Sequence, residues 1–201
     1  MNITKAELQK IEKLLNSPDK ANIDLAITIL SGFAVNDIGA KWLFNYYQQL
    51  QTIENEQSKT SLQSILLGTT NLSPTKASRI LTLLFEKASN KICLKILETF
   101  IDGNTITFPR LDLADFPKSL FQISKIEHIS WQYGNLNHLS DSILNFPTLQ
   151  TLDLRHQPLM TIDEKIVHHP TLTELWISNA LIVTEDLAYD ANFEIFIEAA
   201  Y

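Results

Sequence analysis

The chain has 201 residues, a formal net charge of −7, 45% hydrophobic residues and a single cysteine, Cys93. One cysteine excludes an internal disulfide framework, and no apolar run approaches the roughly 18 residues that a membrane-spanning helix needs. Of the 16 Lys+Arg and 23 Asp+Glu, residues 103–201 hold 5 and 13, which argues against nucleic acid or an anionic membrane as their partner.

Residues 1–102 are predicted to be helical. Thr4 and Glu7 form a T-x-x-E capping box ahead of apolar residues at helical spacing. Ser17-Pro18 predicts a second helix with serine as N-cap and proline at its first position, and Gly32 predicts its end. The remaining helices are expected from Asn36 through Tyr47, in a short segment ending at Gly68, from Ser73-Pro74 through Phe85, and over about residues 90–101.

The amino-terminal segment MNITKAELQKIEKLL carries charges throughout and lacks an apolar core followed by a cleavage site. We therefore expect no signal peptide and a cytoplasmic protein.

Residues 103–201 are organised differently, because apolar residues recur at a fixed spacing of 23. The stretch FPTLQTLDLRHQPL, residues 146–159, has counterparts at residues 123–136 and 169–182, and a less regular one upstream. A fixed period in this range is typical of stacked repeat architectures. The coinciding positions are Ile126, Leu149 and Leu172; Ile129, Leu152 and Leu175; Trp131, Leu154 and Ile177; and Leu136, Leu159 and Ile182.

The segment LQTLDLRHQPL, residues 149–159, resembles the leucine-rich-repeat family, whose pattern is L-x-x-L-x-L-x-x-N-x-L. The resemblance is to a bacterial type with about four repeats. It covers roughly residues 103–194 and implies a solenoid with a parallel sheet. In the family the asparagine bonds backbone between neighbouring coils. Here its slot holds Leu111, Gly134, Gln157 and Ala180, so we expect less regular inner turns.

In the family, the L-x-L segments form a parallel sheet that lines a concave face. Alternation along each strand then places Leu152 and Leu154 in inward slots, together with Trp131. In the first repeat the outward slots hold Thr105, Thr107 and Pro109. The expected partner-binding residues of the concave face are His128, Ser130, Gln132, Thr151, Asp153, Arg155, Glu174, Trp176 and Ser178.

Trp176 is the large aromatic residue of this outward set, and two interpretations stay open. An exposed tryptophan among polar neighbours is typical of an interface anchor. Alternatively, Trp176 lies beneath the C-terminal segment, since a solenoid needs caps at its ends. In the tail NFEIFIEAAY, Phe193, Ile195 and Ile197 alternate on one parity, which predicts an edge strand that pairs with the last repeat.

Common catalytic and cofactor motifs are absent from the sequence, including phosphate-binding loops, H-E-x-x-H and the G-x-S-x-G nucleophile elbow. Cys93 lies at helical spacing from Ile96, Leu97 and Phe100, which favours core packing. The alternative is a thioester-forming nucleophile, as in bacterial leucine-rich-repeat ubiquitin ligases. Those enzymes carry a C-x-D element, whereas Leu94 and Lys95 follow the cysteine here.

His168-His169 raises the question of a metal site, with Asp163 and Glu164 nearby in sequence. We favour a solvated turn on the convex side. In this interpretation His169 partly fills the slot that Phe146 fills one repeat earlier.

The predicted fold is therefore an α+β or α/β solenoid. Residues 1–102 form a helical domain that caps it, and residues 103–201 form a short leucine-rich-repeat solenoid with a C-terminal capping strand. The predicted function is non-catalytic recognition of another protein, one with a basic patch, through the concave face. We expect no cofactor, metal, nucleic acid or membrane partner, and the sequence leaves the oligomeric state open. The alternatives are a structural part in a larger assembly and an enzyme with its site in the helical half.

Overall fold

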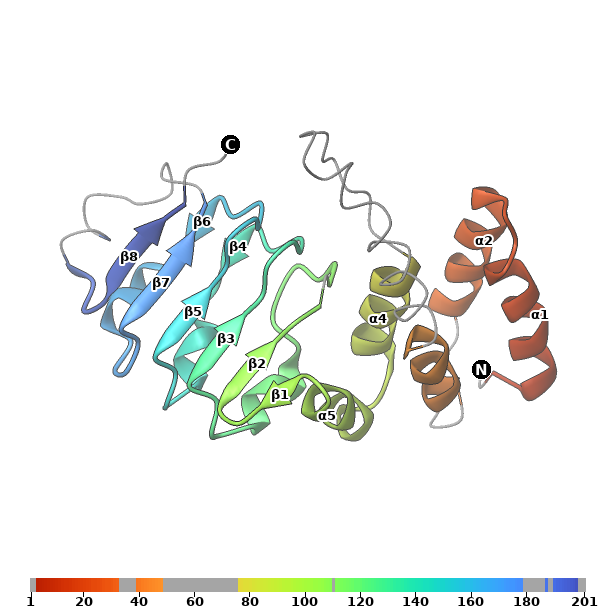
Figure 1. Ribbon diagram of the computed structural model, residues 1–201, viewed down its shortest axis with the longest axis horizontal. Helices are drawn as coiled ribbons and strands as arrows, with labels where there is room; N and C mark the ends of the chain where they lie inside the picture. Colours follow the sequence, from red (N-terminus) through yellow and green to blue (C-terminus); the bar gives the residue numbers. More distant parts are fainter. Residues whose placement is uncertain are drawn as a thin grey trace. The chain divides into compact units, whose positions relative to one another are not determined.

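The computed structural model describes residues 3–32, 39–48, 76–109, 111–178, 187 and 190–198. The chain divides into two compact units, residues 1–93 and 94–201 (Figure 1). The fold is mixed α/β: the first unit is helical, and the second is built on a mostly parallel sheet. None of the helices in the described ranges is long and apolar enough to span a membrane. Residues 94–102, which the sequence groups with the helical domain, fall in the second unit.

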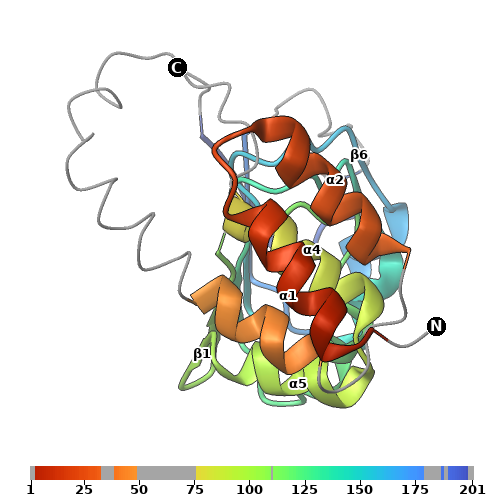
Figure 2. The ribbon, with the colours of Figure 1, turned by 90° about the vertical axis from the view of Figure 1, so that its right-hand side faces the viewer.

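The described residues of the first unit lie mostly in helices (Figure 2). Leu8, Ile11 and Leu15 form the buried face of the first of them. The predicted capping box is confirmed, because Thr4 Oγ1 accepts from Glu7 N at 3.3 Å and Glu7 Oε2 accepts from Thr4 N at 2.7 Å. The helices are α1 (Lys5–Leu15), α2 (Lys20–Ser31), a helical segment over residues 39–48, α4 (Lys76–Lys87) and α5 (Asn90–Glu98), which continues into the second unit.

The second helix begins two positions later than predicted. Asp19, rather than Ser17, is its N-cap, with Oδ1 accepting from Ala21 N at 2.9 Å. Ser17 accepts from Asp19 N instead, and Pro18 still belongs to the bend ahead of the helix. Gly32 is the C-cap, as predicted. Outside the described residues lie three further predictions: the cap Asn36, the helix ending at Gly68 and the helix start at Ser73-Pro74.

Cys93 is 3% exposed, and its Sγ lies 3.8 Å from the carbonyl oxygen of Leu84 and 3.7 Å from that of Ala88. The core position predicted for this residue is confirmed.

The second unit is built on a six-stranded sheet, in which neighbouring strands from β2 to β8 pair in parallel. Ile106 pairs with Ile129, Ile129 with Leu152, and Leu152 with Leu175, so the register advances by one sequence period at each of these steps. This confirms the predicted parallel sheet. In sheet order the strands are β1 (Ile101–Asp102), β2 (Thr105–Thr107), β3 (His128–Ser130), β5 (Thr151–Asp153), β7 (Glu174–Ile177) and β8 (Glu194–Ile197).

Strand β1 is absent from the sequence prediction. Helix α5 ends at Glu98 instead of near residue 101, and Ile101 and Asp102 pair antiparallel with β2. The tight return uses Gly103, whose φ of +60° lies in the region that favours glycine. A short apolar run such as this one fits a helix end and a strand equally well, which is why periodicity alone misassigns it.

The segments that return from one sheet strand to the next follow the same period. They contain the 3-10 helices η1 (Lys118–Gln122), η2 (Asp141–Asn145) and η3 (Glu164–His168). Within them β4 (His138–Leu139) pairs in parallel with β6 (Thr161–Ile162). The core between these segments and the sheet contains Trp131, which is fully buried, as predicted, and meets Phe116 edge-on at 5.1 Å between ring centroids.

Gln157 is a buried polar residue in the slot where the leucine-rich-repeat pattern has asparagine. Its Nε2 donates to the carbonyl oxygen of Trp131 at 2.6 Å, and its Oε1 accepts from Leu136 N at 3.0 Å. These bonds join two segments that lie one sequence period apart. Gly134, one period earlier, leaves room for the amide: a Cβ there would lie 2.7 Å from Gln157 Nε2.

His169 occupies the slot that Phe146 fills one period earlier, as predicted, but it is buried at 1% exposure rather than solvated. Its Nε2 lies 3.2 Å from the carbonyl oxygen of Ile143, and its Nδ1 accepts from Leu172 N at 3.0 Å. These partners require a neutral ring with the proton on Nε2. Burial lowers the pKa of His169, and the bond to the Ile143 carbonyl raises it by less.

Candidate recognition surface

Alternate residues of β3, β5 and β7 lie on one face of the sheet, with Ile129, Leu152 and Leu175 buried between them. The pairing places the predicted residues in rows across the strands. A third row continues just past the strand ends. We call this surface the sheet face: its rows are His128, Thr151 and Glu174; Ser130, Asp153 and Trp176; and Gln132, Arg155 and Ser178.

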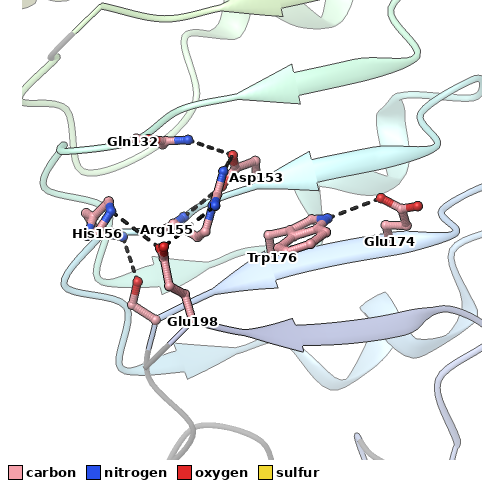
Figure 3. Close-up of polar contacts among 8 residues, drawn as sticks. Gln132, Asp153, Arg155, His156, Glu174, Trp176 and Glu198 are labelled. Atoms are coloured by element: carbon pink, nitrogen blue, oxygen red, sulfur yellow. Dashed lines mark hydrogen bonds and ion pairs between the residues drawn. The ribbon is translucent and has the colours of Figure 1, made fainter. Parts of the chain in front are cut away.

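Asp153 and Arg155 are already engaged with each other (Figure 3). Arg155 Nε donates to Asp153 Oδ1 at 2.9 Å and its terminal NH2 to Oδ2 at 2.8 Å, while Gln132 Nε2 donates to Oδ2 at 2.7 Å. Burial alone would raise the pKa of Asp153, but the bonds from Arg155 and Gln132 outweigh it and lower that pKa. The carboxylate is therefore charged, and a partner could use these groups only by competing with contacts inside the chain.

Trp176 is partly buried and has a partner on each side. Its ring stacks on Phe196 with 4.3 Å between centroids and 13° between planes, and the Arg155 guanidinium carbon lies 5.3 Å from its ring centroid. Its Nε1 donates to Glu174 Oε2 at 3.1 Å (Figure 3). Trp176 thus contacts the C-terminal strand, as the cap interpretation requires, and keeps an accessible part on the sheet face.

The structure adds residues to this surface that the sequence prediction omits. Glu198, which follows β8, reaches back to β5: its Oε1 lies 3.8 Å from an Arg155 terminal nitrogen and its Oε2 3.4 Å from His156 Nε2 (Figure 3). The ring of His156 stacks on Tyr133 at 4.4 Å between centroids. Tyr133 and His156 both have positive φ, 55° and 61°, and stand one period apart in the sequence. Because the two residues are one sequence period apart, the period could have predicted that they lie side by side.

The tail forms the edge strand that its apolar alternation predicts. Phe193 is buried and Ile195 pairs with Leu175, but Ile197 is 47% exposed and Phe196 lies with Trp176 on the sheet face. The step from β7 to β8 is shorter than the sequence period, which would pair Leu175 with Glu198 instead of Ile195. Extending the period therefore could not place Phe196 or Glu198.

Another part of the sheet face is uncommitted. His128, Ser130 and Thr151 are partly exposed, and the described chain offers their side chains no hydrogen bond or ion pair. They lie on the adjacent strands β3 and β5, so their polar groups can serve a ligand without breaking internal contacts. The surface has hydrogen-bonding groups and an aromatic ring, but it is open and, among the residues described, shows no arrangement of nucleophile and base.

Within the part of the chain that is described, no cluster of three or more His, Cys, Asp or Glu side chains could hold a metal ion. No protein-family profile matches the sequence, and no curated protein or solved structure is significantly similar to it.

Proposed function

We propose that residues 103–201 form a short leucine-rich-repeat solenoid of the bacterial type, and that its sheet face recognises another protein. The uncommitted polar side chains of His128, Ser130 and Thr151 on two neighbouring strands carry this proposal. Core-facing residues between them are buried and hold the strands rigidly, which lowers the entropic cost of binding.

The repeat interpretation is supported by the register, which advances by the same sequence period from β2 through β7, and by the hydrogen bonds of Gln157 in the asparagine slot. A parallel strand followed by a compact return segment recurs with that period. In such an arrangement each segment buries its apolar face against its neighbours.

The prediction that residues 1–102 cap the first repeat stays a prediction. We also propose that the protein is cytoplasmic, because its single, buried cysteine suits a reducing compartment.

The test uses matched substitutions on and off the sheet face. His128→Ala and Ser130→Gln alter the face, while His168→Ala and Ser124→Gln make the same chemical changes at exposed positions outside it. The tagged full chain and its variants are used to capture partners from native extract, after circular dichroism and urea unfolding show that each variant is folded.

We expect a partner that is retained by the wild type and both control variants and lost from both face variants. Equal recovery of every partner by all five proteins would overturn the proposal. A partner lost only from the control variants would move the recognition surface to the return segments.

A further inference from the structure

The end of the sheet face formed by β7 and β8 has unbalanced negative charge. The described residues after Lys165 include no lysine or arginine, whereas Glu174 and Glu194 lie on β7 and β8 and Glu198 directly follows β8. Two of these acids, Glu174 and Glu194, are register partners on β7 and β8. Paired positions on neighbouring strands stand about 5 Å apart, so the two carboxylates are close neighbours on one face.

Neither carboxylate has a cationic partner among the described residues. Glu174 accepts a hydrogen bond from Trp176 Nε1 at 3.1 Å, and the side chain of Glu194 makes no ion pair with the described part of the chain. Arg155, the cation at the adjoining end of β5, is held in a bidentate pair with Asp153. Like charges at paired strand positions oppose folding, so the fold itself does not account for this placement.

The surroundings of the pair suit the stem and the head of a basic side chain. Trp176 and Phe196 lie two residues further along the same strands, on the same face, and stack on each other. Trp176 already packs against one guanidinium, that of Arg155. Beside the carboxylates is an open hollow of about 560 Å³ lined by Thr173, Glu174, Ala191, Asn192, Phe193 and Glu194. Aromatic rings favour the methylene stem and the cation, and carboxylates favour the charged head.

We propose, building on the function proposed above, that the partner is anchored at this end of the sheet face by an arginine or lysine side chain. The cationic head of that residue lies between Glu174 and Glu194, and its stem lies along the Trp176–Phe196 stack. The partner is therefore a protein with an exposed basic segment, and the interaction weakens as the salt concentration rises.

The experiment measures binding of a defined peptide to the full chain. The probe is fluorescein-labelled Gly-Ser-Arg-Gly-Ser-Arg-Gly-Ser, and its control replaces both arginines with citrulline, which keeps the shape and removes the charge. Fluorescence anisotropy at low salt is recorded for the wild type, for Glu174→Gln/Glu194→Gln and for Glu98→Gln/Glu164→Gln. Both double variants remove two exposed or partly exposed carboxylates of the second unit, so their net charges are identical.

We expect the arginine peptide to bind the wild type and the Glu98/Glu164 variant, and to bind the Glu174/Glu194 variant about tenfold more weakly. The citrulline peptide should not bind. Equal weakening in the two double variants, or no binding of the arginine peptide to the wild type, would overturn the anchor.

Capture from native extract separates this inference from the proposed function. A partner that is lost from His128→Ala and Ser130→Gln but retained by Glu174→Gln/Glu194→Gln supports recognition by the sheet face and overturns the basic anchor. A partner lost from the Glu174/Glu194 variant alone, with peptide binding also lost, supports the anchor and removes His128 and Ser130 from the recognition surface.

Discussion

The side-chain amide of Gln157 lies 2.6 Å from the carbonyl oxygen of Trp131 and joins two segments one sequence period apart inside the core. The indole Nε1 of Trp131 in turn donates to the carbonyl oxygen of Leu111 at 3.3 Å, one segment further back. Buried backbone carbonyls are costly when unpaired. The two side chains therefore link three segments in series and satisfy backbone groups in two of them, although the slot that holds asparagine in the leucine-rich-repeat pattern holds Leu111, Gly134 and Gln157 here.

Replacing Gln157 with alanine should lower the free energy of unfolding by about 1–3 kcal/mol, because Trp131 O and Leu136 N lose their buried partner. Urea unfolding followed by circular dichroism measures the change. Gln150→Ala is the matched control, since Gln150 is exposed. Equal stability of the two variants would mean that water replaces the amide at no cost.

Gly134→Ala should be destabilising by about 1–3 kcal/mol, because its new Cβ would lie 2.7 Å from both Gln157 Nε2 and Trp131 Nε1. The neighbouring side chains can move only by breaking the hydrogen bonds described above. In a Gln157→Ala background one of the two close contacts is gone, so the cost of Gly134→Ala should shrink. An unchanged cost in that background would place the clash at Trp131 Nε1 instead.

The repeated core of the second unit was predictable because the same apolar slots recur. Ile129, Leu152 and Leu175 specify both the strands and their register, and a slip by one residue would expose all of them. The position of His169 was predictable for the same reason, because it lies one sequence period after Phe146. The pairing of Asp153 with Arg155 follows from a two-residue spacing along one strand face, but sequence alone does not decide between mutual pairing and contact with a partner.

Features that depart from the sequence period or from a single helix-start signal could not be predicted in this way. Phe196 stacks on Trp176 only because the last sheet step is shorter than the sequence period, and the sequence contains no further copy from which to infer that step. Asp19 rather than Ser17 caps α2. Serine and aspartate are both good N-caps, and the choice between them depends on whether Pro18 is the first residue of the helix or precedes it. These positions depend on local packing, which the apolar pattern does not record.

Stability should fall as the pH is lowered from 7.5 to 5.5, because His169 is neutral in the folded protein. Burial lowers its pKa below the ordinary value of 6.5, so the unfolded chain binds the proton more readily. The contribution of neutral His169 to the free energy of unfolding is complete above about pH 6.5. It is lost as the pH falls from there through the lower pKa that His169 has in the folded protein. Urea midpoints at several pH values measure the slope.

His169→Gln should flatten this pH dependence while lowering stability at pH 7.5, where the Nδ1 acceptor for Leu172 N is lost. His168→Gln is the control, because His168 is an exposed histidine next to His169 in the sequence. If His168→Gln flattened the slope and His169→Gln did not, the buried ring would not be the titrating group.

Arg155→Ala should destabilise the protein by about 1–3 kcal/mol at pH 7, because it leaves the Asp153 carboxylate, whose side chain is 14% exposed, without its bidentate partner. Arg155→Lys should cost less, since lysine keeps the charge but not the fork. In an Asp153→Asn background the cost of Arg155→Ala should become smaller. Equal costs in both backgrounds would show that the pair contributes little, and the residue could then be tested directly for partner binding.

Glu194→Gln should raise the thermal midpoint by about 1–2 °C, because it removes one of two like charges at paired positions of β7 and β8. Differential scanning calorimetry at low salt measures the shift, and Glu164→Gln, at an exposed position away from the sheet face, should shift the midpoint less. In roughly 0.5 M NaCl the gain from Glu194→Gln should disappear, because salt screens the repulsion. A gain in stability together with weaker binding of the arginine peptide would mean that Glu194 is kept for a partner at a cost to the fold. A lower midpoint would show instead that the pair is already stabilised within the chain, and a basic side chain of a partner would then not be needed to neutralise it.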